Sequence, residues 1–172
     1  MAQNMDERNV PPAQNEAKRN VPPAILILRL PMVYGPESKG NYKTLAKIAG
    51  KTPIFPTAEN HRSMIFIDNL CECIRLCIDG EKEGFVYPQN RDYVSTPRMV
   101  QEIARARGKK VHLVKALNPL VRLMSHMPGK VEKLTNKAFG SLCIDQNLSP
   151  DREEYCIYSF EESVKRSEKY ER

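Results

Sequence analysis

The apolar residues of this chain form two kinds of pattern, continuous runs and helical stripes. Residues 25–30 read Ile-Leu-Ile-Leu-Arg-Leu, which is typical of a strand buried on both faces of a parallel sheet. Leu70, Cys73 and Cys77 are spaced by three and four residues, which places them on one side of a helix. Further short strands are predicted over 63–67, 84–87 and 111–114, and further helices over 41–49, 96–107, 117–124, 131–138 and 159–168. Strands that alternate with helices indicate the α/β class.

The first apolar run lacks the neighbours that such a strand needs. Residues 1–24 are polar, contain two Pro-Pro pairs and repeat the phrase Arg-Asn-Val-Pro-Pro-Ala. Proline removes the N–H group that a strand ladder or a helix uses. We therefore expect a disordered, proline-rich arm over 1–24 and one folded region over 25–172 whose sheet is incomplete. Pro31 is expected to end the first strand and to lead into a loop over 32–40.

The charge balance narrows the choice of partners only slightly. The chain has 27 Lys and Arg against 21 Asp and Glu, a formal charge of +6 and a pI near 9.1. That excess favours a nucleotide diphosphate, a polynucleotide or an acidic membrane surface, although charges of both signs are interspersed. A run of about 18 apolar residues, which a membrane span requires, does not occur, and neither does an apolar leader. We expect a cytoplasmic protein with no membrane partner.

Five cysteines raise the question of a metal site. Cys73 and Cys77 fall on the apolar stripe described above, whereas Cys71 points to another side of the helix. No fourth ligand follows at the spacing of a zinc finger. The cysteines are therefore interpreted as reduced, buried thiols, and no metal site is expected.

Two phrases carry more specific information than the apolar pattern. Leu-Arg-Leu-Pro-Met-Val-Tyr-Gly-Pro occupies 28–36, and Arg-Ser-Met-Ile-Phe-Ile-Asp-Asn-Leu occupies 62–70. In this order they resemble the R-x-P-x-x-Y-G-P and R-x-x-x-x-[IV]-D-[DN] motifs of extended short-chain dehydrogenases/reductases, the NAD-dependent nucleotide-sugar epimerases and dehydratases. The resemblance covers roughly residues 25–170. It implies a truncated Rossmann-type fold, in which the last strands of the sheet accompany a small substrate-binding domain.

The resemblance implies that part of the first phrase, residues 28–36, lies beside the cofactor. It implies that Pro31, Met32 and Val33 border the nicotinamide of NAD, and that Val33 and Tyr34 border the sugar. A position after a strand is a common place for ligands in open α/β sheets. The simpler interpretation of Pro31 is a turn that ends the strand.

The resemblance places the nucleotide at Asn41 and Arg62. Asn41 begins a predicted helix, where free N–H groups favour anions, but a plain capping role is the alternative. Arg62 corresponds to the arginine that the family uses on the substrate diphosphate, and a guanidinium can donate two parallel hydrogen bonds to phosphate oxygens. A surface ion pair of Arg62 with Glu59 or Asp68 is the alternative.

The motifs that perform the family's chemistry are absent from the sequence. The eight glycines do not form the Gly-x-x-Gly-x-x-Gly loop, which holds the pyrophosphate of NAD at a helix start. None of the seven tyrosines has a lysine four residues later, so the Tyr-x-x-x-Lys pair that supplies the base is missing too. We therefore assign no catalytic residue and expect NAD to bind tightly to the complete family enzyme but not to this chain.

Three functions remain in view. The resemblance favours the nucleotide-sugar-binding part of an epimerase similar to UDP-glucose 4-epimerase, with a UDP-sugar as its ligand and a homodimer in the complete enzyme. A non-catalytic module that keeps the same anion site is the second. A small basic nucleic-acid-binding domain is disfavoured, because no helix-turn-helix, RRM or zinc-finger pattern occurs. We expect no nucleic-acid partner.

We predict that these 172 residues, purified alone, show no NAD-dependent epimerase turnover, since the base and the glycine-rich loop are missing. The measurement is conversion of UDP-glucose to UDP-galactose in the presence of NAD. Turnover above that of a protein-free blank contradicts the prediction.

Overall fold

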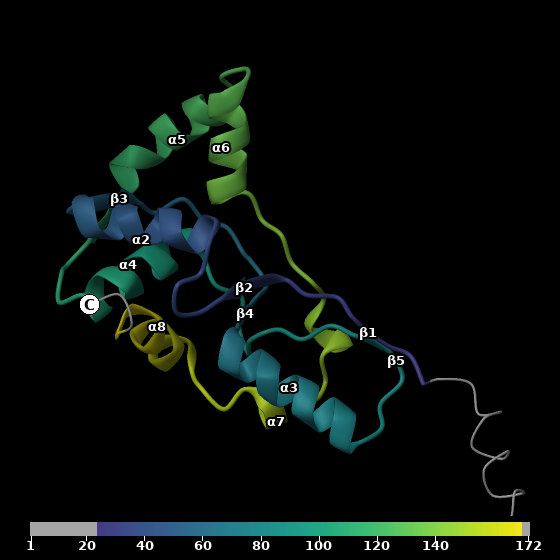
Figure 1. Ribbon diagram of the computed structural model, residues 1–172. Coiled ribbons are helices and arrows are strands. Elements are labelled where there is room, and N and C mark those ends of the chain that lie inside the picture. The colour runs from purple at the N-terminus through teal and green to yellow at the C-terminus, as the bar shows by residue number, and fades with distance from the viewer. Residues whose placement is uncertain (1–23, 170–172) are drawn as a thin grey trace, which may run out of the picture.

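The strands of this protein form three separate parallel pairs. The computed structural model describes residues 24–169, apart from the side chains at positions 130, 131, 134 and 137 (Figure 1). Within this range, β1 (Leu26–Leu28) pairs with β5 (Gly84–Val86), β2 (Met32–Tyr34) with β4 (Met64–Phe66), and β3 (Ile54–Pro56) with β6 (His112–Val114). Most of the arm predicted over 1–24 lies outside the described residues.

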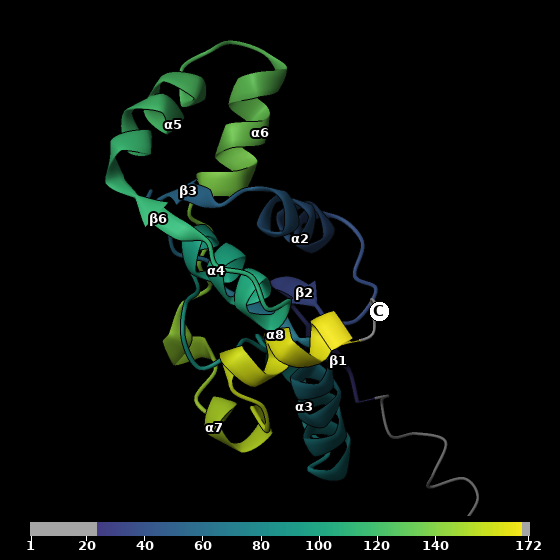
Figure 2. The ribbon, with the colours of Figure 1, turned by 90° about the vertical axis from the view of Figure 1, so that its left-hand side faces the viewer.

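Helices surround these strand pairs. Their bounds are α2 (Asn41–Lys51), α3 (Ile67–Asp79), α4 (Thr96–Ala106), α5 (Asn118–Ser125), α6 (Lys130–Phe139), α7 (Arg152–Tyr155) and α8 (Phe160–Lys169), with 3₁₀ turns η1 (Lys115–Leu117) and η2 (Gln146–Leu148). α2, α4 and α8 gather around β2 and β4, and α3 lies near β1 and β5 (Figures 1 and 2). α5 and α6 form a hairpin that stands at one end of the molecule. The predicted α/β class is confirmed.

Two of the strands were not expected from the sequence. Met32–Tyr34 forms β2, so the loop predicted over 32–40 is wrong in its first part, and Ile54–Pro56 forms β3, where no strand was predicted. Pro31 precedes the first of these strands and Pro56 ends the second, and proline is more typical of turns than of strands. β1 ends at Leu28, before the predicted stop at Pro31, and after Pro31 the chain pairs again, with β4 as the partner of β2.

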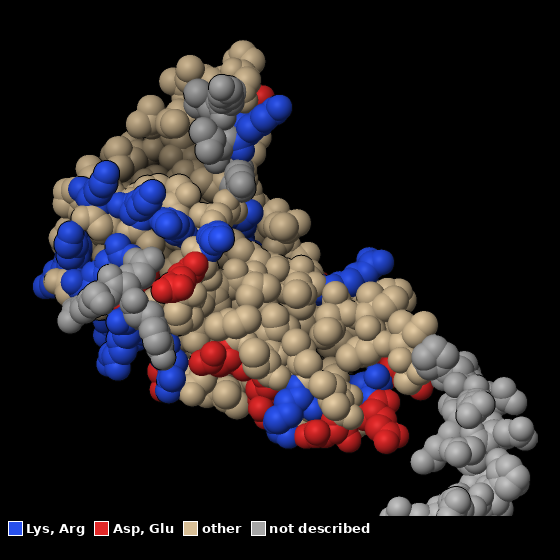
Figure 3. Space-filling model, viewed as in Figure 1, with Lys and Arg blue, Asp and Glu red and all other residues tan. Residues whose placement is uncertain are grey.

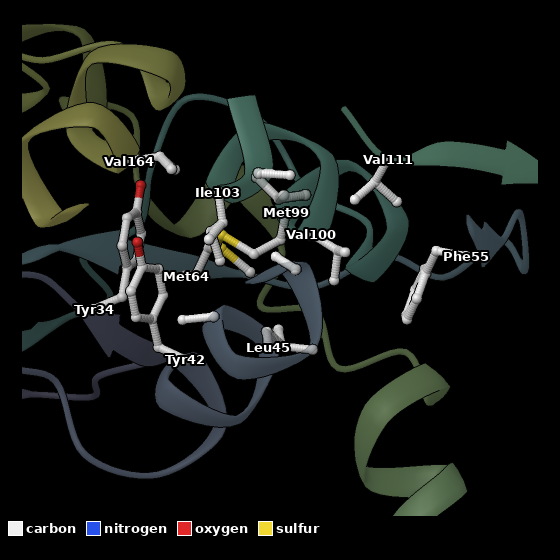
Figure 4. Packing of buried hydrophobic residues seen from close by; sticks show 14 of the residues in the cluster. Tyr34, Tyr42, Leu45, Phe55, Met64, Met99, Val100, Ile103, Val111 and Val164 are labelled. Carbon is white, nitrogen blue, oxygen red and sulfur yellow. The ribbon is translucent and has the colours of Figure 1, made fainter. Parts of the chain in front are cut away.

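The main core is built between β2, β4 and three helices. Tyr34, Leu45, Met64, Met99 and Ile103 are buried there, together with Val164 of α8 (Figure 4). This packing joins segments from the beginning, the middle and the end of the described chain. The core therefore depends on contacts between distant parts of the sequence.

A second apolar cluster surrounds the cysteines of α3. Cys73 and Cys77 are buried and Cys71 is exposed, as the helical spacing predicted. Burial raises the pKa of Cys73 to about 12, so this thiol stays protonated and unreactive near neutral pH. Within residues 24–169, no group of His, Cys, Asp and Glu is placed to hold a metal ion.

β1 is left partly open to solvent. Over the described residues it pairs with β5 alone, and Ile25, Ile27 and Phe85 are 63%, 42% and 56% exposed. The sequence pattern is that of a strand covered on both faces. Among the described residues, β1 thus has one neighbouring strand and its two faces are incompletely covered. This agrees with the incomplete sheet that the sequence predicted.

No helix in the described part of the chain is long and apolar enough to cross a membrane.

A buried carboxylate joins three helices near the end of the chain. Glu168 of α8 accepts a hydrogen bond from the Tyr42 hydroxyl of α2 at 2.7 Å, and it forms an ion pair with Arg107, which follows α4. The Arg107 guanidinium also donates to the Ala46 carbonyl oxygen at 3.1 Å. Burial and the neighbouring carboxylate raise the pKa of Tyr42, so its hydroxyl remains a donor.

We predict that Glu168→Gln lowers the free energy of unfolding by about 2–3 kcal/mol, because it removes one partner of a largely buried ion pair. Glu161→Gln is the matched control: its partner, Arg98, and Glu161 itself are both well exposed, so its cost should stay below about 1 kcal/mol. Urea unfolding followed by circular dichroism measures both values. Equal losses in the two variants contradict the structural role of Glu168.

Candidate functional site

A small pocket lies at the start of α2 and brings together two residues that the sequence singled out. Its volume is about 200 Å³. Its walls come from α2, from the segment before β4 and from the end of α6; the lining residues are Gly40, Asn41, Thr44, Leu45, Ile48, Arg62 and Ala138. Asn41 and Arg62, both predicted to meet the nucleotide, therefore share one cavity.

Arg62 is held in position by its backbone. Its N–H donates to the Val94 carbonyl oxygen at 3.2 Å, and the Val94 N–H returns the bond at 3.1 Å. On the other side Arg62 forms a parallel bridge with Leu142, and the Ser63 N–H donates to the Leu142 carbonyl oxygen at 2.9 Å. Two distant chain segments therefore fix the backbone of Arg62, a residue that lines the pocket.

The Arg62 guanidinium is partly withdrawn from water. The residue is half-buried, and burial lowers the pKa of the guanidinium from its ordinary value. Arginine nevertheless stays protonated in proteins. A partly desolvated cation at a pocket wall interacts more strongly with an anion than a fully hydrated one does.

The start of α2 adds further positive character. Gly40 precedes the helix with a φ of +87°, no side chain caps the helix start, and the first turn contains no acidic residue. The first N–H groups of a helix have no acceptor within the helix, so they are available to an anion. The residues that line the pocket include no Asp or Glu. The pocket is therefore electropositive.

The remaining lining residues are mostly apolar. Leu45, Ile48 and Ala138 supply hydrocarbon surface, and the Thr44 hydroxyl donates to the Gly40 carbonyl oxygen at 3.3 Å. Pockets for whole small molecules are usually about 300–1,000 Å³. A cavity of about 200 Å³ is large enough for a phosphate with an adjoining ring, but a complete nucleotide-sugar would extend beyond it.

Tyr34 is not in the pocket wall, and the structure corrects its predicted contact with a sugar. Its side chain is fully buried, and its hydroxyl forms hydrogen bonds with Ser163 at 2.5 Å and Asn90 at 3.0 Å. Burial raises the pKa of Tyr34 to about 12. Its ring stacks on Tyr42 with centroids 5.6 Å apart. Tyr34 thus has a structural place in the core, with no surface exposed to a ligand.

Pro31, Met32 and Val33 are not among the residues that line this pocket. Pro31 precedes β2, while Met32 and Val33 lie within it and pack against the main core and the cysteine cluster respectively. All three are half-buried. Their contact with a nicotinamide remains a prediction.

Sequence reasoning missed part of the pocket. Thr44, Leu45 and Ile48 follow Asn41 at intervals of three, four and seven residues, so helical spacing could have identified them as neighbours on one face. Ala138 could not have been found in this way. It reaches the pocket because the end of α6 is anchored, with Phe139 stacked on Phe55 of β3 at a centroid distance of 5.7 Å.

One curated relative is similar in sequence. The chain is 31% identical to a UDP-glucose 4-epimerase of Vibrio cholerae over 127 residues, a match that covers 70% of this chain and 38% of that protein. No family model matches the chain.

Solved structures establish the fold. A UDP-N-acetylglucosamine 4-epimerase from Bacillus cereus matches 99% of this chain and 60% of its own, with a TM-score of 0.57 and 13% identity. A Thermus thermophilus UDP-glucose 4-epimerase in complex with NAD matches 86% of this chain and 46% of its own, with a TM-score of 0.55 and 15% identity. The predicted Rossmann-type fold is therefore confirmed. The chain spans 38–60% of the length of these three proteins.

We predict opposite effects of alanine at Gly40, which precedes α2, and at Gly50 within α2. Gly40→Ala should lower the free energy of unfolding by about 1–2 kcal/mol, because a positive φ strains a residue with a Cβ atom. Gly50→Ala is the control: its Cβ would lie 3.5 Å from Arg107, an ordinary contact, and replacing a helical glycine should add about 0.5–1 kcal/mol. Thermal unfolding measures both variants. Equal changes contradict the assigned start of α2.

Proposed function

We propose that this chain, which belongs to the family of NAD-dependent nucleotide-sugar epimerases and dehydratases, provides the nucleotide-sugar-binding part of an enzyme similar to UDP-glucose 4-epimerase. It corresponds to a C-terminal part of these proteins. The observation that carries this proposal is the shared pocket of Arg62 and the start of α2. Sequence and fold suggest the family, and the pocket suggests which part of the substrate this chain binds.

The chemistry of the pocket suits a diphosphate. Arg62 can donate two hydrogen bonds to phosphate oxygens, and the free N–H groups of α2 can donate to the same group from a second direction. The amide of Asn41 adds a neutral donor or acceptor at the helix start. Leu45, Ile48 and Ala138 offer an apolar surface to the adjoining ring. The names of the relatives indicate that uridine diphosphate sugars are the substrates to test first.

The sequence lacks the glycine-rich loop that holds the pyrophosphate of NAD in this family. α3 begins directly after β4, and Phe66 rather than a glycine loop precedes it. Pro31, Met32 and Val33 are proposed to border the nicotinamide in the complete family enzyme, but the donors for the pyrophosphate are missing from the sequence. We therefore derive no hydride-transfer step from this chain.

A non-catalytic binding module is the second candidate. The absence of the Tyr-x-x-x-Lys pair favours it, because the pocket can bind an anion without that pair. The two candidates predict the same ligand and differ in turnover.

Titration calorimetry with UDP-glucose, UDP and uridine tests the proposal. Arg62→Ala should weaken UDP-glucose and UDP binding by about ten- to a hundredfold, which corresponds to loss of a hydrogen bond to a charged group. Uridine, which lacks phosphates, should bind weakly, and its affinity should be the same for the wild-type protein and for Arg62→Ala. Arg75→Ala is the matched control, because Arg75 lies on α3 in exposed ion pairs with Glu72 and Asp79.

Two results oppose the proposal. Unchanged UDP affinity in Arg62→Ala removes the assigned role of the guanidinium. Equal affinity of the wild-type protein for uridine and UDP shows that the pocket does not recognise phosphate.

A further inference from the structure

The α5–α6 hairpin carries an apolar stripe that faces solvent. Leu120, Leu123, Met124 and Met127 are 54%, 63%, 37% and 47% exposed. Their spacing of three and four residues places them on one side of α5 and the turn that follows it. In a globular protein such a stripe normally faces the core. Here the hairpin stands away from the rest of the molecule (Figures 1 and 2).

A longer stretch that includes the hairpin, residues 109–144, contains the excess positive charge of the chain. Residues 109–144 include seven Lys or Arg and one Glu, while the rest of the chain has twenty of each sign. The net charge of +6 is therefore confined to this stretch. Lys115, Arg122 and Lys133 are exposed on or beside the hairpin.

The neighbouring helix α2 extends this basic region. Lys43, Lys47 and Lys51 are exposed and repeat every four residues along it, and no acidic residue occurs between 38 and 58. Figure 3 shows Lys and Arg side chains over α2 near the hairpin, whereas Asp and Glu lie mainly over the opposite end, around α3. The positive surface is thus local to one end of the molecule.

We propose that the α5–α6 hairpin docks the protein on a bilayer surface that contains anionic lipids. An amphipathic helix with a basic surround lies in the plane of such a surface, with its apolar side about 5–10 Å into the boundary between headgroups and acyl chains. Leu120, Leu123, Met124 and Met127 provide the apolar side, and the lysines and arginines face the headgroups. This contact requires no membrane span. It differs from the sequence-based expectation of no membrane partner, which rested on the absence of a span.

Other partners fit these observations less well. A nucleic acid is bound through cations combined with aromatic stacking, but the exposed large apolar side chains that the structure describes on the hairpin are leucines and methionines. The part of the longer relatives that this chain does not match is expected at β1 and β5, where exposed apolar residues lie on an open sheet. That surface lies away from the hairpin (Figure 1).

Flotation of the full chain with vesicles tests the proposal. At 0.1 M salt the protein should float with vesicles of phosphatidylcholine and phosphatidylglycerol, and not with phosphatidylcholine alone. Binding should fall at least about tenfold at 0.5 M salt, because surface electrostatic attraction is screened.

Two pairs of substitutions separate the apolar and the electrostatic contributions. Leu120→Ser with Leu123→Ser should weaken binding to anionic vesicles about tenfold or more through loss of apolar burial. Lys115→Glu with Arg122→Glu should do the same at 0.1 M salt through loss of attraction. Ile78→Ser with Ile157→Ser is the apolar control, since these residues are 67% and 53% exposed outside the hairpin. Lys165→Glu with Lys169→Glu on α8 is the charge control.

All of these substitutions are at exposed positions, and circular dichroism checks that each variant is folded. Equal flotation with neutral and anionic vesicles overturns the proposal. Undiminished binding of the Leu120→Ser, Leu123→Ser variant to anionic vesicles overturns it too. The proposal is also overturned if the protein does not float with anionic vesicles but binds a short RNA duplex or an acidic protein.

Discussion

The parallel pairing of β2 with β4 is the contact on which the rest of the structure depends. A parallel pair needs a crossover between its strands, and α2 and β3 lie within this one. The crossover begins soon after Tyr34 and ends at Arg62, just before β4. It therefore brings the start of α2 and the Arg62 guanidinium to one pocket, while α4 and α8 bury the pair from outside. If β2 and β4 did not pair, neither the core nor the pocket would exist.

Two parts of the described surface, one at β1 and β5 and one on α5, leave apolar side chains exposed, whereas the region around β2 and β4 does not. Around β2 and β4 the apolar side chains are buried and the polar groups have partners, as Tyr34 and Glu168 illustrate. β1 and β5 leave Ile27 and Phe85 exposed on an open sheet, and α5 leaves its leucines exposed on a basic hairpin. We interpret the first as a surface for the rest of a Rossmann-type sheet, and the second as a surface for anionic lipids. The first surface belongs to an open sheet and the second to a basic hairpin, and this is the reason for assigning them to different partners.

The sequence predicted what regular spacing and composition can encode. The buried cysteines of α3 followed from helical spacing. Asn41 and Arg62, which the family resemblance singled out, line one pocket, and their contact with a nucleotide remains a prediction. β2 and β3 were missed because Pro31 directly precedes β2 and Pro56 ends β3, and proline is more typical of turns than of strands. Tyr34 was expected beside a ligand, but Ser163 and Asn90, which are far away along the chain, complete its hydrogen bonds in the core.

The central claim is that Arg62 and the start of α2 form one phosphate-binding pocket, and nuclear magnetic resonance can test it residue by residue. In a ¹⁵N-labelled protein titrated with UDP, we predict shift changes in the backbone amides of Asn41 and Tyr42 and in the Nε–H of Arg62. Uridine at the same concentration should leave these signals in place. Shift changes confined to other regions, such as β1 and β5, or equal changes with uridine, would contradict the account.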